Sequence, residues 1–408
     1  MNLLNVYFFL WALVLPVTSV LVIPSVQGTT PAYIFALAAI VLIPLLAKNY
    51  GVRYLFFVLT IFLITLFISL VAQFSLSLSN VTNFGEMRMV DPRDKSLLLR
   101  DTMFTQTLYL LAGISTFSFI RVFYRVKWDN YLFTGIVILA IFGIYECIYF
   151  FIFGQSGDFL SNRTFGEGLE GSGSLFQIIQ LGPFTIERLK SLTGEPSMYA
   201  FTVLPFWIYA IHSKRFLIQF VLFITLLLST STTAILGLCI YFIGYLMYFK
   251  LRVRYIISFM ITLIILYFGF HQMVNDFFTE MVVKKVTMEN LSGIDRFESF
   301  RSSWDFFVNS PILNMLFGVG FGYIRSTDMF ATLLINTGII GIILVTIAFA
   351  IPIFNLPNSY RNIGIKLSLI TIYLTMMISV SEFAYLSIWL FLGIAYNEID
   401  ATKRSGVV

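Results

Sequence analysis

The fold class that this sequence predicts is all-α: a polytopic membrane bundle of about twelve transmembrane helices with enlarged loops on one face. Two observations lead to it. Hydrophobic residues make up 58% of the 408 residues, and the mean hydropathy is +0.89. The chain also divides into about a dozen apolar segments, and the gaps between them alternate between basic and nearly neutral composition. Since a spanning helix needs about 20 mainly apolar residues, we expect one integral membrane domain over residues 1–408.

The apolar segments follow one another in order along the chain. The first six run near Leu3–Ile23, Pro31–Ala47, Tyr54–Phe74, Thr102–Ile120, Tyr131–Phe153 and Met198–Ile211. The second six run near Phe216–Ser229, Thr233–Phe249, Tyr255–Phe270, Met329–Phe354, Leu367–Val380 and Phe383–Asn397. Several are shorter than 20 residues, which a span tolerates where flanking side chains reach the interface or the bilayer thins. The first segment has no basic region ahead of it, so we expect a retained span rather than a cleaved signal peptide.

Basic residues concentrate in the even-numbered gaps and in the C-terminal tail. These regions hold 14 Lys and Arg residues and only three acids, Asp129, Glu398 and Asp400. The basic residues are Lys48, Arg53, Arg121, Arg125, Lys127, Lys214, Arg215, Lys250, Arg252, Arg254, Arg361, Lys366, Lys403 and Arg404. Short cytoplasmic loops of membrane proteins carry an excess of Lys and Arg. We therefore expect this face, with both termini, to be cytoplasmic.

The opposite face carries three long polar segments, residues 75–101, 154–197 and 271–328. Together they contain 12 basic and 16 acidic residues, and long translocated loops largely escape the positive-inside rule. The net charge of +5 is thus an average over a basic inner face and a mildly acidic outer face, and it does not indicate a nucleic-acid partner. Two Cys and two His show no zinc-ligand spacing, so no metal site is predicted.

Glu146 is an acidic residue inside the fifth apolar segment. A charge at the centre of a span costs about 2.5–3.5 kcal/mol on insertion scales, and such a residue usually faces the bundle interior or a wet cavity. Two interpretations stay open for Glu146: a structural hydrogen bond, or a group that lines a groove for lipid. It does not form a chain of buried acids of the kind that proton-coupled transporters use, and this weighs against a transporter.

The first cluster that could carry chemistry is RLKSLTGEPSMYA, residues 188–200, at the entry to the sixth apolar segment. Pro196 suits the first turn of a helix, and Glu195 before it would meet the positive end of the helix dipole. That arrangement is purely structural. In the alternative, Glu195 and Arg188 lie at the mouth of a cavity and place an acid and a cation at the membrane surface.

The second cluster is a predicted amphipathic helix followed by a glycine-rich segment. Its apolar residues recur at helical spacing, at Phe297, Phe300, Trp304, Phe307 and Val308. Asp295 resembles a capping residue at the start of that helix, which we expect to lie on the outer membrane surface. Arg296 and Arg301 fall outside the apolar stripe and are free to face a cavity or water. For Arg301 the structural alternative is an i,i+4 pair with Asp305, worth a few tenths of a kcal/mol.

Together, these outer segments supply arginines that suit a lipid-linked pyrophosphate: Arg163, Arg188, Arg296, Arg301 and Arg325. Guanidinium groups bind phosphate oxygens bidentately and stay charged in a poorly hydrated cleft. When a sugar leaves a polyprenyl pyrophosphate, negative charge grows on the departing group, and preorganised arginines would stabilise it without a metal. Removing one such group typically costs roughly 10²–10³ in rate. A carboxylate, Glu195 or Asp328, could accept the proton of the attacking hydroxyl.

The order of these features resembles the Wzy-type polysaccharide polymerases of bacterial envelopes and their relatives, the O-antigen ligases. The resemblance rests on RLKSLTGEPS before an apolar segment, a helix with arginines and Trp304, Ser310-Pro311, and the segments Gly318–Gly322 (GVGFG) and Thr337–Gly341 (TGIIG). It implies a GT-C-like, metal- and cofactor-independent glycosyltransferase at the outer face of the bacterial inner membrane. Its substrates would be undecaprenyl-pyrophosphate-linked glycans, as donor and as acceptor, and its protein partner a chain-length regulator.

One position departs from the ligase pattern, and it favours a polymerase. Ligases of this group usually carry a histidine about eleven residues before the first glycine of a Gly-x-x-Gly pair, and here that position is Thr327. We therefore expect a repeat-unit polymerase with Glu195, Asp328 and Arg296 as catalytic residues. The expected substrate-binding residues are Arg163, Arg188, Arg301, Arg325 and Glu146. The alternatives are a ligase that transfers glycan to lipid A core, and a twelve-span transporter or flippase of lipid-linked oligosaccharides.

Overall fold

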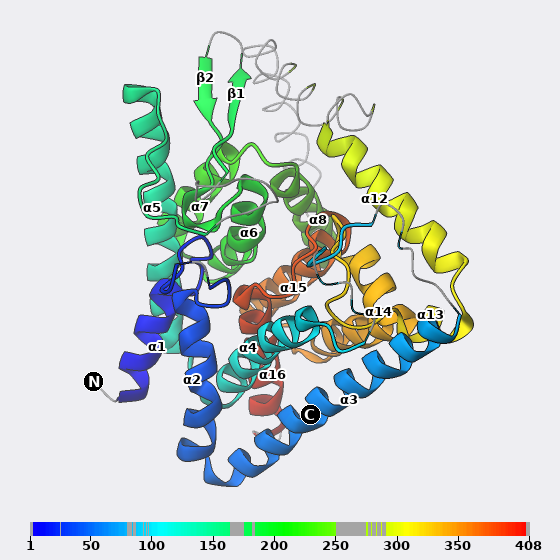
Figure 1. Cartoon of the computed structure of the whole chain (residues 1–408). Helices are drawn as coiled ribbons and strands as arrows, with labels where there is room; N and C mark the ends of the chain where they lie inside the picture. The colour runs from blue at the N-terminus through cyan, green and yellow to red at the C-terminus, as the bar shows by residue number, and fades with distance from the viewer. Residues whose placement is uncertain are drawn as a thin grey trace.

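Helices make up nearly all of the regular structure in the described part of the chain, a computed structural model of which is shown in Figure 1. The structure describes residues 3–24, 26–79, 84, 87–92, 94, 96, 98–163, 175–181, 184–249, 275, 279, 283, 287 and 291–404. The predicted ninth apolar segment, Tyr255–Phe270, and the basic residues Lys250, Arg252 and Arg254 before it lie outside these residues.

The helices follow the predicted apolar segments closely. Up to residue 249 the helices are α1 (Leu3–Val14), α2 (Pro31–Leu46), α3 (Lys48–Leu78), α4 (Asp101–Phe123), α5 (Asp129–Phe153), α6 (Pro196–His212), α7 (Phe216–Leu228) and α8 (Thr232–Tyr248). From residue 291 onward they are α12 (Leu291–Val308), α13 (Ile312–Phe317), α14 (Met329–Asn355), α15 (Tyr360–Ser379) and α16 (Leu386–Arg404). Short 3-10 turns lie at Val126–Trp128 (η1) and Ser191–Thr193 (η2). Strands β1 (Ile178–Leu181) and β2 (Phe184–Glu187) form an antiparallel hairpin in the second outer segment, with Ile178 opposite Glu187.

Among the described residues, five helices are long and apolar enough to cross a bilayer. They are Tyr50–Leu78, Asp101–Phe123, Val126–Phe153, Met329–Asn355 and Tyr360–Ser379. The most apolar of them, in α3, buries only 11% of its apolar window and exposes bulky side chains such as Phe56 and Phe67. Such a surface is stable against lipid and costly in water. The prediction of an all-α membrane protein is confirmed, whereas the number of about twelve spans stays a prediction.

The first predicted segment, Leu3–Ile23, is helical only as far as Val14. Pro16 explains the early end, because a proline disfavours helical backbone at the residue before it, here Leu15, and lacks an N–H of its own. Beyond Pro16 the chain leaves the helix, and the amides of Thr18 and Ser19 donate to the carbonyl oxygen of Leu192 at 2.9 and 3.1 Å.

Several of the basic gaps that the structure describes meet at one end of the bundle. Trp128 Nε1 donates to Asn5 Oδ1 at 2.9 Å, and Arg121 Nε lies 2.8 Å from Asp400 Oδ2, so the two chain ends meet the α4–α5 connection. In Figure 1 both termini lie in the lower half of the view and the β-hairpin lies at the top. This end is called the basic end below, and the opposite end the outer end.

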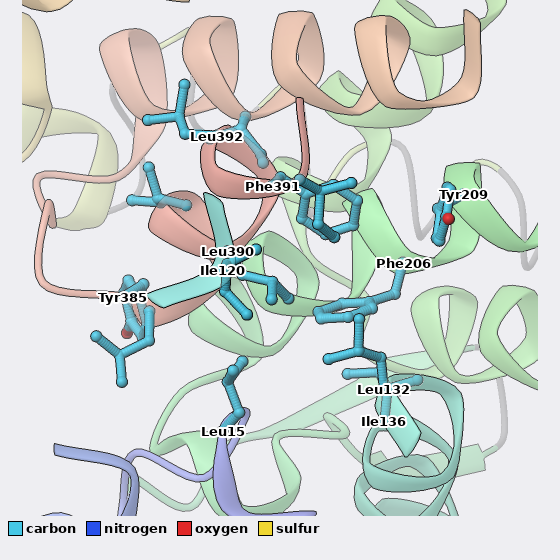
Figure 2. Close-up of a cluster of buried hydrophobic side chains, with 14 of the residues drawn as sticks. Leu15, Ile120, Leu132, Ile136, Phe206, Tyr209, Tyr385, Leu390, Phe391 and Leu392 are labelled. Carbon is cyan, nitrogen blue, oxygen red and sulfur yellow. The ribbon is translucent and has the colours of Figure 1, made fainter. Parts of the chain in front are cut away.

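The bundle interior at the centre of the molecule packs α6 and α15 against each other, and α4 against α16. Figure 2 shows the side chains that meet there, including Ile120, Phe206 and Phe391. The rings of Phe206 and Phe391 pack edge to face with centroids 5.1 Å apart. A Cβ on Gly393 would lie 2.7 Å from Ile120 Cβ, so α4 and α16 approach closely because this position carries no side chain.

The predicted amphipathic helix exists as α12, but it begins at Leu291, four residues before Asp295. The prediction that Asp295 caps the helix is wrong, since this residue lies beyond the first turn and instead pairs with Arg88 at 3.3 Å. Most of the apolar stripe is exposed, namely Phe297, Phe300, Trp304 and Val308, while Phe307 is buried. A helix with an exposed apolar stripe is typical of a membrane surface.

Candidate functional site

Glu195 is the residue immediately before α6. Its backbone is extended, and Pro196 takes the first helical position as the sequence predicts. The carboxylate makes no capping hydrogen bond to the helix; Oε2 accepts one from Ser197 Oγ at 3.1 Å. The side chain is therefore available to groups outside its own helix.

Three arginines from two of the outer segments lie close enough to Glu195 to interact with it electrostatically. Burial lowers the pKa of Arg188 and of Arg296, and the negative charge of Glu195 opposes this in both cases. The pKa of Arg325 is raised, chiefly by Glu382, and Glu195 adds to the effect. The structure thus brings together residues that lie up to 137 positions apart in the sequence. We call Arg188, Glu195, Arg296 and Arg325 the outer charge cluster.

Arg188 is fixed by neutral oxygen atoms. Its Nη1 donates to Gln177 Oε1 at 2.6 Å, its Nε to Thr230 Oγ1 at 3.1 Å and its Nη2 to the Thr230 carbonyl oxygen at 3.0 Å. Gln177 comes just before the hairpin and Thr230 from the α7–α8 connection. These bonds orient the guanidinium group without neutralising its charge.

Arg296 projects from α12 toward the end of α15. Its Nη1 lies 3.4 Å from Ser379 Oγ, a long hydrogen bond, and Asp328 and Glu195 act on it at longer range. Within the described residues, neither Arg188 nor Arg296 has a carboxylate within ion-pair distance. Two half-buried cations with neutral partners leave positive charge free for an anionic ligand.

Asp328 occupies the N-cap of α14. Its Oδ1 accepts a hydrogen bond from the Ala331 amide at 2.8 Å, which satisfies one of the free N–H groups of the helix start. Burial raises the pKa of this carboxyl, and the Ala331 amide and Arg296 oppose that shift. Asp328 therefore has a structural role at this position and lies within electrostatic range of Arg296.

Next to the outer charge cluster lies a cavity with an empty volume of about 1010 Å³, its open mouth included. Arg163 and Arg325, two of the expected substrate-binding residues, both line it. Its other polar and aromatic lining residues include Tyr33, Tyr109, Gln106, Asn336, Glu382 and Tyr385. Arg325 Nη2 lies 3.2 Å from Glu382 Oε2, and Glu382 Oε1 accepts a hydrogen bond from the Ala384 amide at 3.0 Å. Clefts lined mainly by apolar side chains, with a few convergent polar groups, are typical of ligand sites.

The glycine-rich segment 318–322 positions Arg325 through Asn336 of α14. The amides of Tyr323 and Ile324 donate to Asn336 Oδ1 at 3.0 and 2.8 Å, and Asn336 Nδ2 donates back to the Ile324 carbonyl oxygen at 2.6 Å. Gly318, Gly320 and Gly322 all have positive φ, which only glycine adopts without strain. Sequence reasoning found the glycines and missed Asn336, since a single Asn in an apolar helix gives no signal of its partner.

Two predicted site residues lie apart from the outer charge cluster. Arg301 is exposed and pairs with Asp305 at 3.8 Å, which is the structural alternative for this residue. Glu146 is fully buried in α5, where its Oε1 lies 3.3 Å from Lys190 Nζ. Lys190 was not singled out from the sequence, although it lies within the RLKSLTGEPS segment.

The described outer residues hold arginine and carboxylate groups and, among them, no set of three or more His, Cys, Asp or Glu arranged to hold a metal ion. Fixed guanidinium groups beside one carboxylate can bind an anion and accept a proton from a neighbouring hydroxyl. No protein-family model matches this chain, and no curated protein matches it significantly.

Proposed function

We propose that this protein is a glycosyltransferase that polymerises undecaprenyl-pyrophosphate-linked oligosaccharide repeat units. One observation carries the proposal: at one end of the bundle, Arg188 and Arg296 are held by hydrogen bonds to neutral partners alone among the described residues, and both lie within electrostatic range of Glu195, as Arg325 does. A diphosphate is the anion that this arrangement suits, because guanidinium groups bind its oxygens in pairs.

In the proposed reaction, the donor is a growing chain on undecaprenyl pyrophosphate and the acceptor is one lipid-linked repeat. The bond between the anomeric carbon and the diphosphate oxygen breaks, and a glycosidic bond forms to an acceptor hydroxyl. Arg188 and Arg296 stabilise the charge that develops on the departing diphosphate. Glu195 accepts the hydroxyl proton, with Asp328 as the second candidate base.

The cavity beside the cluster is the proposed place of the sugars nearest the reacting bond. Its tyrosines offer flat apolar faces with hydroxyl groups at their edges, and Gln106, Asn336 and Glu382 offer hydrogen-bonding groups. Arg163 on its wall is the proposed contact for a second phosphate or for a charged sugar.

The same proposal includes the finer features of fold and location that the sequence predicts. The protein would be a multi-pass, GT-C-like protein of the bacterial inner membrane with about twelve spans and both termini in the cytoplasm. A chain-length regulator would be its protein partner. The clustering of basic connections at the end that carries both termini supports this orientation.

The test is elongation by the purified protein in lipid nanodiscs. Lipid-linked repeat units are extracted from host cells that lack this protein, and products are separated by size. The wild-type chain is expected to produce a ladder of longer glycans, and Arg296→Ala is expected to abolish it. Arg88→Ala is the matched control, since Arg88 is an exposed outer arginine whose ion-pair partner among the described residues is Asp295.

Other outcomes of the same assay identify the alternatives. Transfer of a single glycan to added lipid A core, without elongation, would make the protein a ligase. Movement of the intact lipid-linked repeat across vesicle membranes, without any new glycosidic bond, would make it a flippase.

A further inference from the structure

A lysine is buried beneath the outer charge cluster. The Lys190 side chain is 1% exposed, and its Nζ lies 2.6 Å from Asp158 Oδ2 and 3.3 Å from Glu146 Oε1. Both acids are buried as well, at 4% and 0% exposure. A buried ammonium group is stable only when paired, so these contacts hold Lys190 firmly in place.

The three residues come from three separate segments. Glu146 belongs to α5, Asp158 to the chain that follows α5, and Lys190 to the connection between β2 and η2. Asp158 also orders its own turn, because its Oδ1 accepts hydrogen bonds from the amides of Leu160 and Ser161 at 3.3 and 3.0 Å. One ammonium group therefore ties the outer chain to a membrane-spanning helix.

A third buried carboxyl, that of Glu187, lies within electrostatic range of Lys190. Glu187 is 1% exposed, and both of its carboxyl oxygens lack a hydrogen-bond partner within the described residues. Lys190 and Asp158 act on it electrostatically, and burial raises its pKa to about 7. Without Lys190, the three carboxyls would face one another with no cation among the described groups around them, and like charges in a buried site repel strongly.

The segment on which Lys190 lies carries two members of the outer charge cluster. Arg188 is two residues before it and Glu195 is five residues after it. The backbone between them is tightly turned, with positive φ at Ser191 and Gly194, and Ser191 Oγ donates to the Leu139 carbonyl oxygen at 2.7 Å. A shift at Lys190 would therefore displace both Arg188 and Glu195.

We propose that Lys190 is a positioning residue: its buried ion pairs with Glu146 and Asp158 fix the 188–195 segment in the place that lets Arg188 and Glu195 share one site. Glu146 then acts as the anchor in α5 and does not contact lipid. This inference rests on the proposed function for its catalytic consequence, but its structural core can be tested without any activity.

A native cysteine reports whether the segment is in place. Cys147 is half-buried in α5, and its Sγ donates to the Glu187 carbonyl oxygen at 3.8 Å, so β2 covers it. The other cysteine, Cys239, is exposed and is replaced by Ser to leave one thiol. The rate of alkylation by N-ethylmaleimide then measures how often the segment lifts away from α5.

In the Cys239→Ser background, Lys190→Met is expected to raise the alkylation rate of Cys147 at least tenfold, and Lys190→Arg to stay within threefold of the parent. Lys366→Met is the matched control, because Lys366 is also buried but lies in α15 with a neutral partner, Asn358 Oδ1, at 2.7 Å. It is expected to leave the rate unchanged. An unchanged rate in folded Lys190→Met would overturn the proposal.

If Lys190→Met does not fold, as judged by gel filtration, Asp158→Asn replaces it. This change keeps the side-chain shape, removes the charge of the shorter ion pair, and is expected to raise the rate at least threefold; no change would count against the proposal. Elongation supplies the second measurement. Lys190→Met is expected to lower kcat at least tenfold with KM for the lipid-linked repeat within threefold, and Lys190→Arg to restore kcat. No elongation by the wild-type chain would refute the proposed function while leaving the alkylation result valid.

Discussion

The two ends of the bundle use arginine in opposite ways. At the basic end, Arg361 lies 2.6 Å from Glu398 and 3.7 Å from Asp129, and Arg121 lies 2.8 Å from Asp400, so every acid predicted on that face has a direct partner. At the outer end, Arg188 and Arg296 hydrogen-bond to neutral side-chain and main-chain oxygens. Arg121 and Arg361 at the basic end pair directly with acids, whereas Arg188 and Arg296 at the outer end keep their charge beside Arg325, which does pair with Glu382.

This difference separates structural from functional arginines. Removing one partner of a direct ion pair in a half-buried site leaves the other charge uncompensated and destabilises the fold, while the intact pair has no capacity left for a ligand. A guanidinium held by neutral groups keeps its orientation and its charge, which is the state that an anion-binding site requires before the ligand arrives. Substitutions at the two ends should therefore affect different measurements.

Arg361→Ala should show the largest effect on stability. The Arg361 guanidinium also donates to the hydroxyl groups of Tyr209 and Tyr124, at 2.8 and 2.6 Å, so its loss strands several buried groups. We expect the free energy of unfolding to decrease by about 3–5 kcal/mol. The measurement is the decrease in the thermal unfolding temperature in detergent. Elongation per folded molecule should stay near the wild-type rate. A variant with normal stability would show that the basic end is not held by this network.

Arg296→Ala or Arg188→Ala should show the opposite pattern. Each removes positive charge from the outer charge cluster, and we expect elongation to fall by roughly 10²–10³ while the unfolding temperature changes little. The measurement is the initial rate of ladder formation beside the unfolding curve. If both variants lose stability and keep the wild-type elongation rate, Arg188 and Arg296 are structural residues, as Arg361 is.

Glu187 gives a pH dependence of stability at the outer end of the bundle. Because burial raises its folded-state pKa to about 7 from an ordinary value of 4.5, its contribution to stability is complete below about 4.5 and is lost as the pH rises through 7. The loss is on the order of 3 kcal/mol, since the shift spans about 2.5 pKa units and one unit corresponds to about 1.4 kcal/mol. Unfolding temperatures between pH 5 and pH 8 should fall in the wild type and vary less in Glu187→Gln. If the unfolding temperatures of the wild type and of Glu187→Gln change equally with pH, Glu187 is not the source of the pH dependence.

Arg301→Ala should have the smallest effect. The family resemblance implies substrate contact at Arg301, whereas the structure pairs its exposed side chain with Asp305. We expect a stability change of a few tenths of a kcal/mol and less than a twofold change in elongation rate. A hundredfold loss of elongation would instead place Arg301 with the functional arginines.

The sequence predicts what depends on local pattern. The lengths of the apolar segments predict the helices, and Pro196 predicts the start of α6. The alternation of basic and neutral gaps predicts the basic end. It could not predict that Arg188 is held by Thr230, or that Lys190 is buried between Glu146 and Asp158, because these contacts join segments that are distant in the chain. The start of α12 was misjudged because residues before Asp295 also suit a helix, and a capping pattern alone does not exclude an earlier beginning.

The break in α14 at Gly338 brings together two glycines that lie 20 residues apart in the chain. A methyl group on Gly338 would lie 2.4 Å from the backbone of Leu316, and one on Gly318 would lie 2.3 Å from the backbone of Asn336, so both glycines belong to one crossing. Either replacement by alanine would push the same two stretches of chain apart. The damage should consequently be non-additive: the Gly318→Ala/Gly338→Ala double variant should unfold little sooner than the worse single one, and evolution at one position would be constrained by the other.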